Sequence, residues 1–315
     1  MSPKPVLPNV DPLPAPLEGA QIRLNMGAGP VAVYCLTPPT QAPQRPFRPL
    51  LLVHSINASA SAFEVKPLYD HYGKTRPTYA LDLPGYGLSD RSDRPYTIRL
   101  MTDALLEVLA HIRIQHPGAL VDVLGVSLSC EYVARAACEM PGAIGRIALV
   151  SPTGFSGSKR YRAAPGSSRG IAWLHRLLSN PKWSSGLFNT LTRPGVIRYF
   201  LKRTFGTRKI DEALWRYDVL TTRQSGAKNA PLCFLSAYLF AADINTLYES
   251  LTCPVFVSMA TRGDFTDYRG RTAVSDRRNW QFHSVEGGAL PYFENLAGFT
   301  AKLDQFFSSD FGPMP

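Results

Sequence analysis

The sequence predicts an α/β fold, in which helices cover both faces of a mostly parallel, eight-stranded sheet and a helical segment is inserted. Short apolar runs alternate with stretches of helical periodicity, which is typical of a parallel sheet. Residues 155–244 form an exception, because they show helical patterning and no strand pattern. The chain has 315 residues and is 45% hydrophobic, which suits one large domain with an insertion.

Eight strands are expected in order along the chain. Leu50–His54 is wholly apolar until its last residue, as expected of a buried parallel strand. Ligands bind beyond the carboxyl ends of such strands, so we expect the site at that edge of the sheet. The other expected strands are Gln21–Leu24, Val31–Leu36, Thr78–Leu83, Val121–Leu124, Ile147–Val150, Val255–Met259 and Trp280–Val285.

Helices are expected between these strands and in the insertion. The spacing of apolar residues predicts helices over Phe63–Tyr72, Tyr96–Ile114, Ser129–Met140 and Phe299–Phe307. In the insertion it predicts Ile171–Leu178, Val196–Thr204, Ala213–Thr222 and Leu232–Ala242. We therefore divide the chain into a Pro-rich N-terminal tail (1–19), a core (20–154 and 245–315) and a basic helical cap (155–244).

The positive charge is concentrated in the predicted cap. The formal net charge is +10, yet residues 155–230 alone hold fifteen Lys or Arg and three Asp or Glu, a balance of +12. This excess predicts an anionic ligand or peripheral contact with an acidic membrane. The nearly all-apolar Leu232–Ala242 predicts an apolar ligand pocket or a buried helix. We expect no nucleic-acid partner, because no recognition module is visible.

Several protein classes are not expected. There is no run of roughly 18 apolar residues, and residues 1–18 lack the apolar stretch of a secretory signal. We therefore expect a cytoplasmic protein, with membrane contact only at its periphery. We expect free thiols and neither a metal nor a cofactor, because no metal-site spacing links the five cysteines, Cys35, Cys130, Cys138, Cys233 and Cys253.

One pentapeptide carries the clearest chemical signal. Gly125-Val126-Ser127-Leu128-Ser129 follows an apolar strand and opens a helix, which is the setting of a nucleophile elbow. A sharp turn of this kind needs small residues two positions on either side of the serine. Gly125 meets that need, while Ser129 stands where glycine is usual. The pattern predicts Ser127 as the nucleophile.

Three further motifs accompany the elbow. They are Leu51-Leu52-Val53-His54-Ser55-Ile56-Asn57, then Asp82-Leu83-Pro84-Gly85-Tyr86-Gly87-Leu88-Ser89, and Pro254-Val255-Phe256-Val257 followed by Gly263-Asp264. With these motifs the chain resembles the α/β hydrolase superfamily from about Gln21 to the C-terminal helix. The resemblance is to the capped esterase, haloperoxidase-like and epoxide-hydrolase-like branch in particular.

The resemblance implies roles for individual residues. The backbone N–H of Leu128, with that of Ile56 or Ser55, would form the oxyanion hole. Asp264 would be the acid of the triad, with Asp267 as the second choice. The alternative for Gly263-Asp264 is a simple turn, since Asp is favoured in turns for its local hydrogen bonds.

The base of the triad is missing. The family carries its histidine after the last strand, and this chain reads Glu286-Gly287-Gly288-Ala289-Leu290-Pro291-Tyr292-Phe293-Glu294 there. Pro291 and Glu294 hold the register, so Ala289 occupies the histidine position. We expect none of the six histidines to replace it, namely His54, His71, His111, His116, His175 and His283.

The loss of the base limits the chemistry. Removing it costs on the order of 10⁴–10⁶ in rate, so conventional hydrolysis should be weak. Three interpretations stay open. The chain is a non-catalytic binding or scaffolding protein, or an enzyme whose reaction needs no serine proton transfer, or a true hydrolase in which Ala289 is an engineered change.

Overall fold

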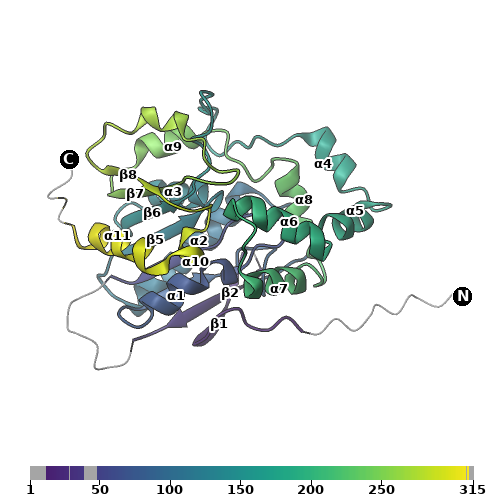
Figure 1. Ribbon diagram of the computed structural model, residues 1–315, viewed down its shortest axis with the longest axis horizontal. Coiled ribbons are helices and arrows are strands. Elements are labelled where there is room, and N and C mark those ends of the chain that lie inside the picture. The colour runs from purple at the N-terminus through teal and green to yellow at the C-terminus, as the bar shows by residue number, and fades with distance from the viewer. Residues whose placement is uncertain (1–11, 28, 39–47, 310, 312–315) are drawn as a thin grey trace, which may run out of the picture.

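An eight-stranded sheet forms the centre of the computed structural model, which describes residues 12–27, 29–38, 48–309 and 311. The strand order is β1-β2-β4-β3-β5-β6-β7-β8 (Figure 1). Only β2 runs against its neighbours, so the predicted mostly parallel sheet is confirmed. The strands are β1 (Ala20–Met26), β2 (Gly29–Leu36), β3 (Leu50–Val53), β4 (Thr78–Leu81), β5 (Val121–Val126), β6 (Ile144–Val150), β7 (Val255–Ala260) and β8 (Trp280–Val285).

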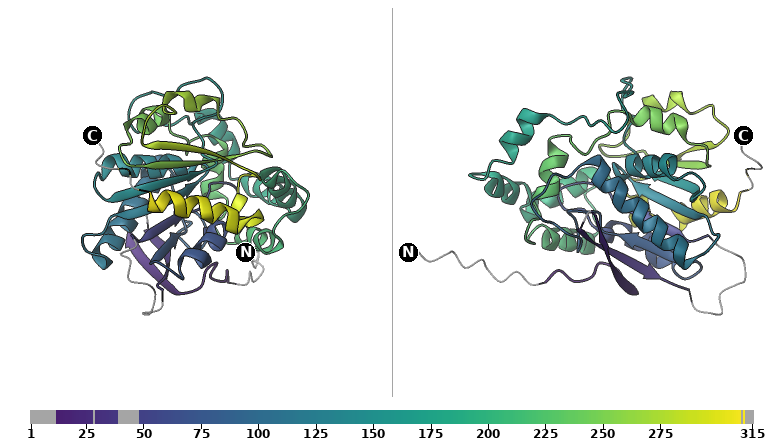
Figure 2. Two further views of the ribbon diagram at one scale, coloured as in Figure 1. Left: turned by 60° about the vertical axis from the view of Figure 1, so that its left-hand side comes forward. Right: turned by 180° about the vertical axis from the view of Figure 1, so that it is seen from behind.

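Helices cover both faces of the sheet because successive strand residues point to opposite sides. Leu51 and Val53 of β3 join a core with α2 (Ile98–Gln115), α3 (Ser129–Glu139) and α9 (Ile244–Ser250). Leu50 and Leu52 join a second core with α1 (Lys66–Tyr72) and α11 (Leu296–Ser308). Figure 2 shows α11 lying across its face of the sheet.

Local sequence explains where these helices begin. The predicted helix over 63–72 is a short 3₁₀ turn, η1 (Ala62–Val65), followed by α1, whose first turn contains Pro67. The helix predicted from Tyr96 starts at Ile98, because the Thr97 side chain caps it by accepting the N–H of Leu100 at 3.1 Å. Two further short elements are η2 (Arg269–Ala273) and α10 (Pro291–Glu294).

Residues between β6 and β7 form helices, and the described chain has no strand there. These helices gather beside one end of the sheet, with α4 and α5 outermost (Figures 1 and 2). They are α4 (Ala172–Leu178), α5 (Ser184–Leu191), α6 (Pro194–Phe205), α7 (Glu212–Thr221) and α8 (Asn229–Leu235), and α9 follows them.

The insertion differs from the sequence prediction in two respects. The helix predicted over 232–242 ends at Leu235, because the chain turns at Ala237, which has a φ of 64°. That prediction is wrong beyond Leu235. In addition, the sequence did not predict α5 in the insertion or α9 directly after it. Both helices are short and contain too few apolar residues to show helical periodicity.

The described part of the N-terminal segment packs on the domain. Leu13 and Leu17 are buried, and Leu17 belongs to the second core. Two tyrosine hydroxyls bind this segment, since Tyr217 donates to the carbonyl of Pro14 at 2.8 Å and Tyr69 to that of Glu18 at 2.9 Å. The first eleven residues of the predicted tail lie outside the described residues.

None of the helices in the described residues combines the length and the apolar character needed to cross a membrane.

Candidate functional site

Ser127 sits on a strained turn at the carboxyl end of β5. Its φ is 55°, a left-handed conformation that is unfavourable for a residue with a side chain. The turn is fixed by its own N–H, which donates to the carbonyl of Val150 on the neighbouring strand β6 at 2.8 Å. The side chain is partly exposed, and its hydroxyl has no hydrogen bond to another described residue. The turn therefore presents the hydroxyl outward from the sheet.

The residues flanking Ser127 make this turn possible. A Cβ on Gly125 would lie 3.1 Å from the Val133 side chain and 3.3 Å from the Cys130 backbone, so a larger residue would crowd α3. Ser129 is fully buried and stabilises the turn through its hydroxyl. The hydroxyl accepts the N–H of Val126 at 3.0 Å and lies within 2.9 Å of the Val126 carbonyl. A serine at this position thus adds bonds that a glycine could not make.

The loop after β3 contains the candidate oxyanion donors. The N–H of Ser55 donates to Glu64 at 2.7 Å, and the Ser55 hydroxyl donates to the same carboxylate at 3.0 Å. The N–H groups of Ile56 and Leu128 make no hydrogen bond to other described residues, and both side chains are buried. Of the two donors considered in this loop, Ile56 is therefore the one that is unpaired.

Glu64 was not singled out from the sequence, yet it organises the loop. Its buried carboxylate accepts from Asn57 at 2.7 Å in addition to the two groups of Ser55. Its backbone carbonyl accepts the hydroxyl of Tyr292 at 2.9 Å. The partners of its carboxylate lie only nine and seven positions earlier, but no spacing in the sequence marks Glu64 as their acceptor, and the hydroxyl of Tyr292 comes from 228 positions away.

His54 holds the same loop to the next strand connection. Its Nε2 accepts the N–H of Leu83 at 2.9 Å, so the proton is on Nδ1, which donates to the carbonyl of Ser55 at 2.6 Å. His54 is completely buried. Both ring nitrogens are engaged, which fits a structural role and leaves neither free to act as a base.

Ala289 lies next to the end of α6. It is 3% exposed, and its N–H donates to the carbonyl of Thr204 at 2.8 Å. Its carbonyl accepts the hydroxyl of Ser151, which follows β6, at 3.1 Å. The preceding Gly288 packs so closely on Thr204 and Phe205 that any Cβ there would overlap them. The C-terminal turn of α6 thus covers the loop in which a base would stand.

Asp264 is exposed and ion-paired. Its side chain is 42% exposed and lies 2.6 Å from Nε of Arg203 on α6, with a second bond from the same guanidinium at 3.0 Å. Its N–H donates to the Arg203 carbonyl at 3.3 Å. Asp264 and Ala289 therefore meet at the same turn of α6. No hydrogen bond links either of them to Ser127 in the described chain.

Asp267, the second candidate acid, is held by other groups. It accepts the N–H of Gly157 at 2.9 Å and pairs with Arg269 at 2.8 Å. These bonds, those to Arg269 first, keep its pKa well below the usual range of an aspartate. Asp267 joins the start of the insertion to the loop after β7.

A second buried carboxyl group lies beside the oxyanion loop. Asp218 on α7 is 2% exposed, and its Oδ1 has no hydrogen-bond partner in the described residues. Burial raises its pKa well above the ordinary value, and the nearby Glu64 raises it further, whereas a hydrogen bond with Ser59 lowers it. The adjacent Tyr217 stacks on Phe63 of η1 at 4.9 Å. Sequence reasoning missed Asp218 because its only signal was an acid within an amphipathic helix.

The remaining candidate bases lie elsewhere. His175 on α4 faces α8, with its Nε2 3.4 Å from Sγ of Cys233. His283 lies within β8 and stacks on Phe256 at 4.6 Å. Burial lowers the pKa of His283, and Lys302 lowers it further. Neither makes a hydrogen bond to Ser127.

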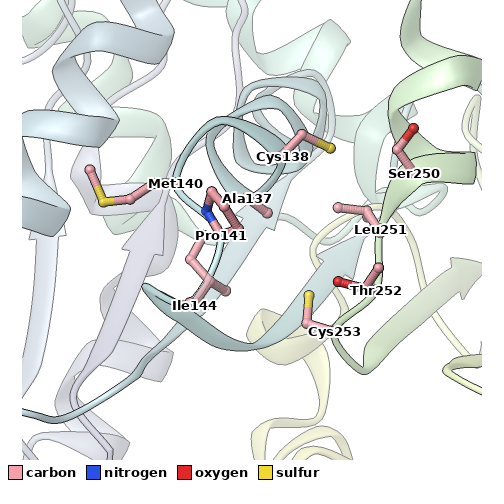
Figure 3. A pocket seen from close by; sticks show the side chains of 10 residues that line it. Ala137, Cys138, Met140, Pro141, Ile144, Ser250, Leu251, Thr252 and Cys253 are labelled. Carbon is pink, nitrogen blue, oxygen red and sulfur yellow. The ribbon is translucent and has the colours of Figure 1, made fainter. Parts of the chain in front are cut away.

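One cavity, of about 250 Å³, lies at the opposite edge of the sheet (Figure 3). It is formed where α3 ends and β6 begins, together with residues 250–253 that lead into β7. Cys138 and Cys253 line it, and burial raises the pKa of both thiols, that of Cys253 to about 12. Such thiols are poor nucleophiles at neutral pH. In the described part of the chain, no group of three His, Cys, Asp or Glu is arranged to hold a metal ion.

Comparison with known proteins gives one family match. The family model described as "Alpha/beta hydrolase family" matches residues 50–301. No curated protein matches the chain significantly.

Solved structures give many fold matches at low identity. A probable hydrolytic enzyme from Pseudomonas aeruginosa PAO1 is 16% identical with a TM-score of 0.69, and the match covers 92% of this chain and 94% of that one. The enol-lactonase from Burkholderia xenovorans LB400 is 14% identical with a TM-score of 0.68 (91% and 100% covered). A carboxylesterase from Bacillus subtilis is 15% identical with a TM-score of 0.64 (93% and 93% covered). At these identities the likeness concerns the fold alone.

Proposed function

Because this chain belongs to the alpha/beta hydrolase family, we propose that it is a capped member related to serine ester hydrolases, with Ser127 at the nucleophile position. In this proposal Ala289 stands at the position of the lost base, and conventional hydrolysis is weak. The observation that carries the proposal is the strained turn at Ser127, whose hydroxyl is unpaired among the described residues. The N–H of Leu128, next in the chain, and that of Ile56, in the loop after the neighbouring strand β3, are unpaired as well. The names of the lactonase and the carboxylesterase are consistent with the ester class of substrate.

An unpaired serine hydroxyl and two free N–H donors suit attack on a carbonyl carbon. The hydroxyl would add to the carbonyl, and the two N–H groups would stabilise the negative charge that develops on its oxygen. The serine must lose its proton during attack, and no described residue makes a hydrogen bond to the hydroxyl that could receive it. Residual reaction therefore depends on the donors and on binding alone, which is why we expect it to be slow.

A second candidate function is ligand binding without catalysis. It is favoured by the arrangement at α6, where Asp264 is paired with Arg203 in an exposed position and the loop of Ala289 is covered by Thr204 and Phe205. Under this alternative Asp264 and Ala289, at the family's acid and base positions, only attach the insertion to the core through Arg203 and Thr204. An engineered change to Ala289 in a true hydrolase would give the same structure, provided that Asp264 is already paired with Arg203 in that hydrolase.

The ligand would lie between the proposed cap, 155–244, and the carboxyl ends of the strands. Apolar side chains of α8 and the basic charge of the cap favour a small apolar or anionic molecule. Asp264, retained in the proposal as the acid, would have to exchange Arg203 for a base to act in a triad. The pairing with Arg203 therefore limits what restoring a histidine alone can achieve.

The test introduces a histidine at position 289 and measures the reactivity of Ser127. Ala289→His should raise kcat/KM toward p-nitrophenyl esters by on the order of 10²-fold, the lower end of what a positioned base supplies. Ala289→Asn is the matched control, since asparagine is polar and of similar reach but cannot accept the proton. Ser127→Ala identifies the residue that a fluorophosphonate probe labels.

The outcomes separate the candidates. A gain in Ala289→His that is absent in Ala289→Asn and abolished by Ser127→Ala supports the serine hydrolase proposal. If the unmodified protein labels rapidly at Ser127, the binding-only alternative is wrong. If Ala289→His keeps the Tm of the parent but shows no gain in rate or labelling, the proposal that Ser127 remains a competent nucleophile is contradicted.

A further inference from the structure

The outer edge of the insertion exposes large apolar side chains. Trp173 is 66% exposed and Leu177 is 48% exposed, and their i,i+4 spacing puts both on one stripe of α4. Helix α4 buries none of its residues, so this stripe does not serve the core. Helix α4 itself lies at the periphery of the molecule, next to α5 (Figures 1 and 2).

Neighbouring segments extend this surface. Trp183, which is 44% exposed, donates its indole N–H to the carbonyl of Leu177 at 2.9 Å and so lies against the same helix. Ile171 and Leu235 are exposed as well, and the backbone bond from Ile171 to Ser236 at 2.9 Å joins their segments. These five residues, Ile171, Trp173, Leu177, Trp183 and Leu235, form what we call the α4 edge.

The chain around the α4 edge is exclusively basic. Residues 171–210 contain eight Lys or Arg and no Asp or Glu. Arg176 and Lys182 are exposed beside the edge, and neither has an ion-pair partner in the described residues. By contrast, Arg198 and Arg203 are paired with Glu212 and Asp264. Arg176 and Lys182 therefore add unpaired positive charge beside the edge, and Arg193, Lys202, Arg208 and Lys209 elsewhere in this segment also have no ion-pair partner among the described residues.

We propose that the α4 edge is a docking surface for an anionic phospholipid membrane. Exposed tryptophans flanked by aliphatic side chains enter the interfacial layer of a bilayer, and adjacent Lys and Arg bind the charged headgroups. An acidic protein partner would also match the charge and the exposed tryptophans, and absence of binding to anionic vesicles at low salt would favour it over the membrane. The proposal does not depend on any catalytic activity of Ser127.

The experiment is cosedimentation of the full chain with vesicles. Pure phosphatidylcholine vesicles are compared with vesicles that also contain phosphatidylglycerol, at low and at high salt. We expect binding to the anionic vesicles that weakens as salt is added. Tryptophan emission should also be quenched by lipids with brominated acyl chains, since the indoles would reach the acyl boundary.

Two double variants test the two parts of the proposed binding separately, namely apolar insertion and attraction between charges. Trp173→Ala with Leu177→Ala should lower the partition coefficient by roughly tenfold or more, because apolar insertion is lost. Arg176→Gln with Lys182→Gln should lower it by roughly 20- to 30-fold, since each basic residue near an anionic surface is worth about fivefold in binding. The charge pair remains informative if the apolar pair disturbs folding.

Matched controls come from the opposite edge of the sheet. Ile114 is 73% exposed and Arg113 is exposed beside it, at the end of α2 that leads into the start of β5. Ile114→Ala with Arg113→Gln should leave binding unchanged. The proposal is overturned by absence of binding to anionic vesicles at low salt, by equal binding to neutral vesicles, or by an equal loss in the control pair.

Discussion

Asp82 shows how one side chain supports the loops around the candidate site. It is fully buried and accepts hydrogen bonds from the Tyr34 hydroxyl at 2.7 Å and from the N–H groups of Ala62 and Leu88 at 2.7 and 2.8 Å. Ala62 begins η1, which carries Glu64, and Glu64 in turn binds Ser55 in the loop after β3. Gly87 is pressed against this carboxylate and has a φ of 49°. The turn motif that begins at Asp82 therefore supports the loops around the candidate site.

Gly87→Ala should be strongly destabilising. Its Cβ would overlap the Asp82 carboxylate and the backbone is left-handed, so both strain and broken buried hydrogen bonds contribute. We expect a loss of about 3 kcal/mol or more in the free energy of unfolding, measured by urea denaturation. Gly118→Ala is the control, because Gly118 has a φ of 76° but open space around it. Its cost should be only about 1 kcal/mol; equal costs would contradict the role given to Asp82.

Helix α7 carries two acids whose surroundings are opposite. Asp218 faces Glu64 and Ser59 under the helix, and burial raises its pKa. Glu212, one turn and a half earlier, is exposed and pairs with Arg198 at 2.7 Å, which lowers its pKa. The amphipathic geometry of the helix thus shifts the pKa values of the two acids in opposite directions.

The pH dependence of stability should reflect Asp218. Burial raises the pKa of Asp218 in the folded protein above its unfolded value, so this group makes stability fall as the pH rises from about 4, the unfolded pKa, toward the raised pKa. Asp218→Asn removes the ionisable group and should flatten the decline of Tm as the pH rises above about 4. Thermal scans across pH measure it. Glu212→Gln should show the same dependence of Tm on pH as the parent protein. If Asp218→Asn also keeps that dependence, Asp218 is not the group responsible for it.

At the scale of the whole molecule, two buried ion pairs join the insertion to helix α3 of the core, namely Glu131–Arg169 and Arg135–Asp243. Glu131 of α3 is fully buried and pairs with Arg169 at 2.7 Å, and it accepts the N–H of Ala241 at 2.7 Å. The Arg169 guanidinium lies between the rings of Tyr161 and Phe240, at 4.1 and 4.9 Å. The segment that enters the insertion, at Arg169, and the segment that leaves it, at Ala241, therefore both bind the carboxylate of Glu131, four residues after Ser127.

Arg169→Ala should loosen this connection. It leaves a buried carboxylate without its charge partner, which costs roughly 3–5 kcal/mol. We expect a lower Tm and faster proteolysis within residues 160–240, followed by mass spectrometry of the fragments. Arg162→Ala removes an exposed pair with Glu249 and should cost less than about 1 kcal/mol. Similar losses for both variants would show that the Glu131 pair does not hold the insertion.

The sequence alone determined the features that depend on short-range patterns. Strand and helix periods identified the mostly parallel sheet, and the spacing of glycine and serine located the turn at Ser127. That Ala289 stands at the position of the family's base stays a prediction from the spacing of Pro291 and Glu294. Such features can be read locally because a few adjacent residues decide the backbone conformation there. The end of α8 is an exception, since the left-handed turn at Ala237 has no glycine to announce it.

Only the tertiary structure decided which groups those local features meet. Ser55 gives its N–H to Glu64, Asp264 pairs with Arg203, and the loop of Ala289 is covered by the end of α6. The partners of Asp264 and Ala289 lie 61 and 85 positions away in the numbering of the chain, on a helix of the insertion. No local sequence pattern predicts these contacts, because they depend on how the helices between β6 and β7 pack beside the end of the sheet.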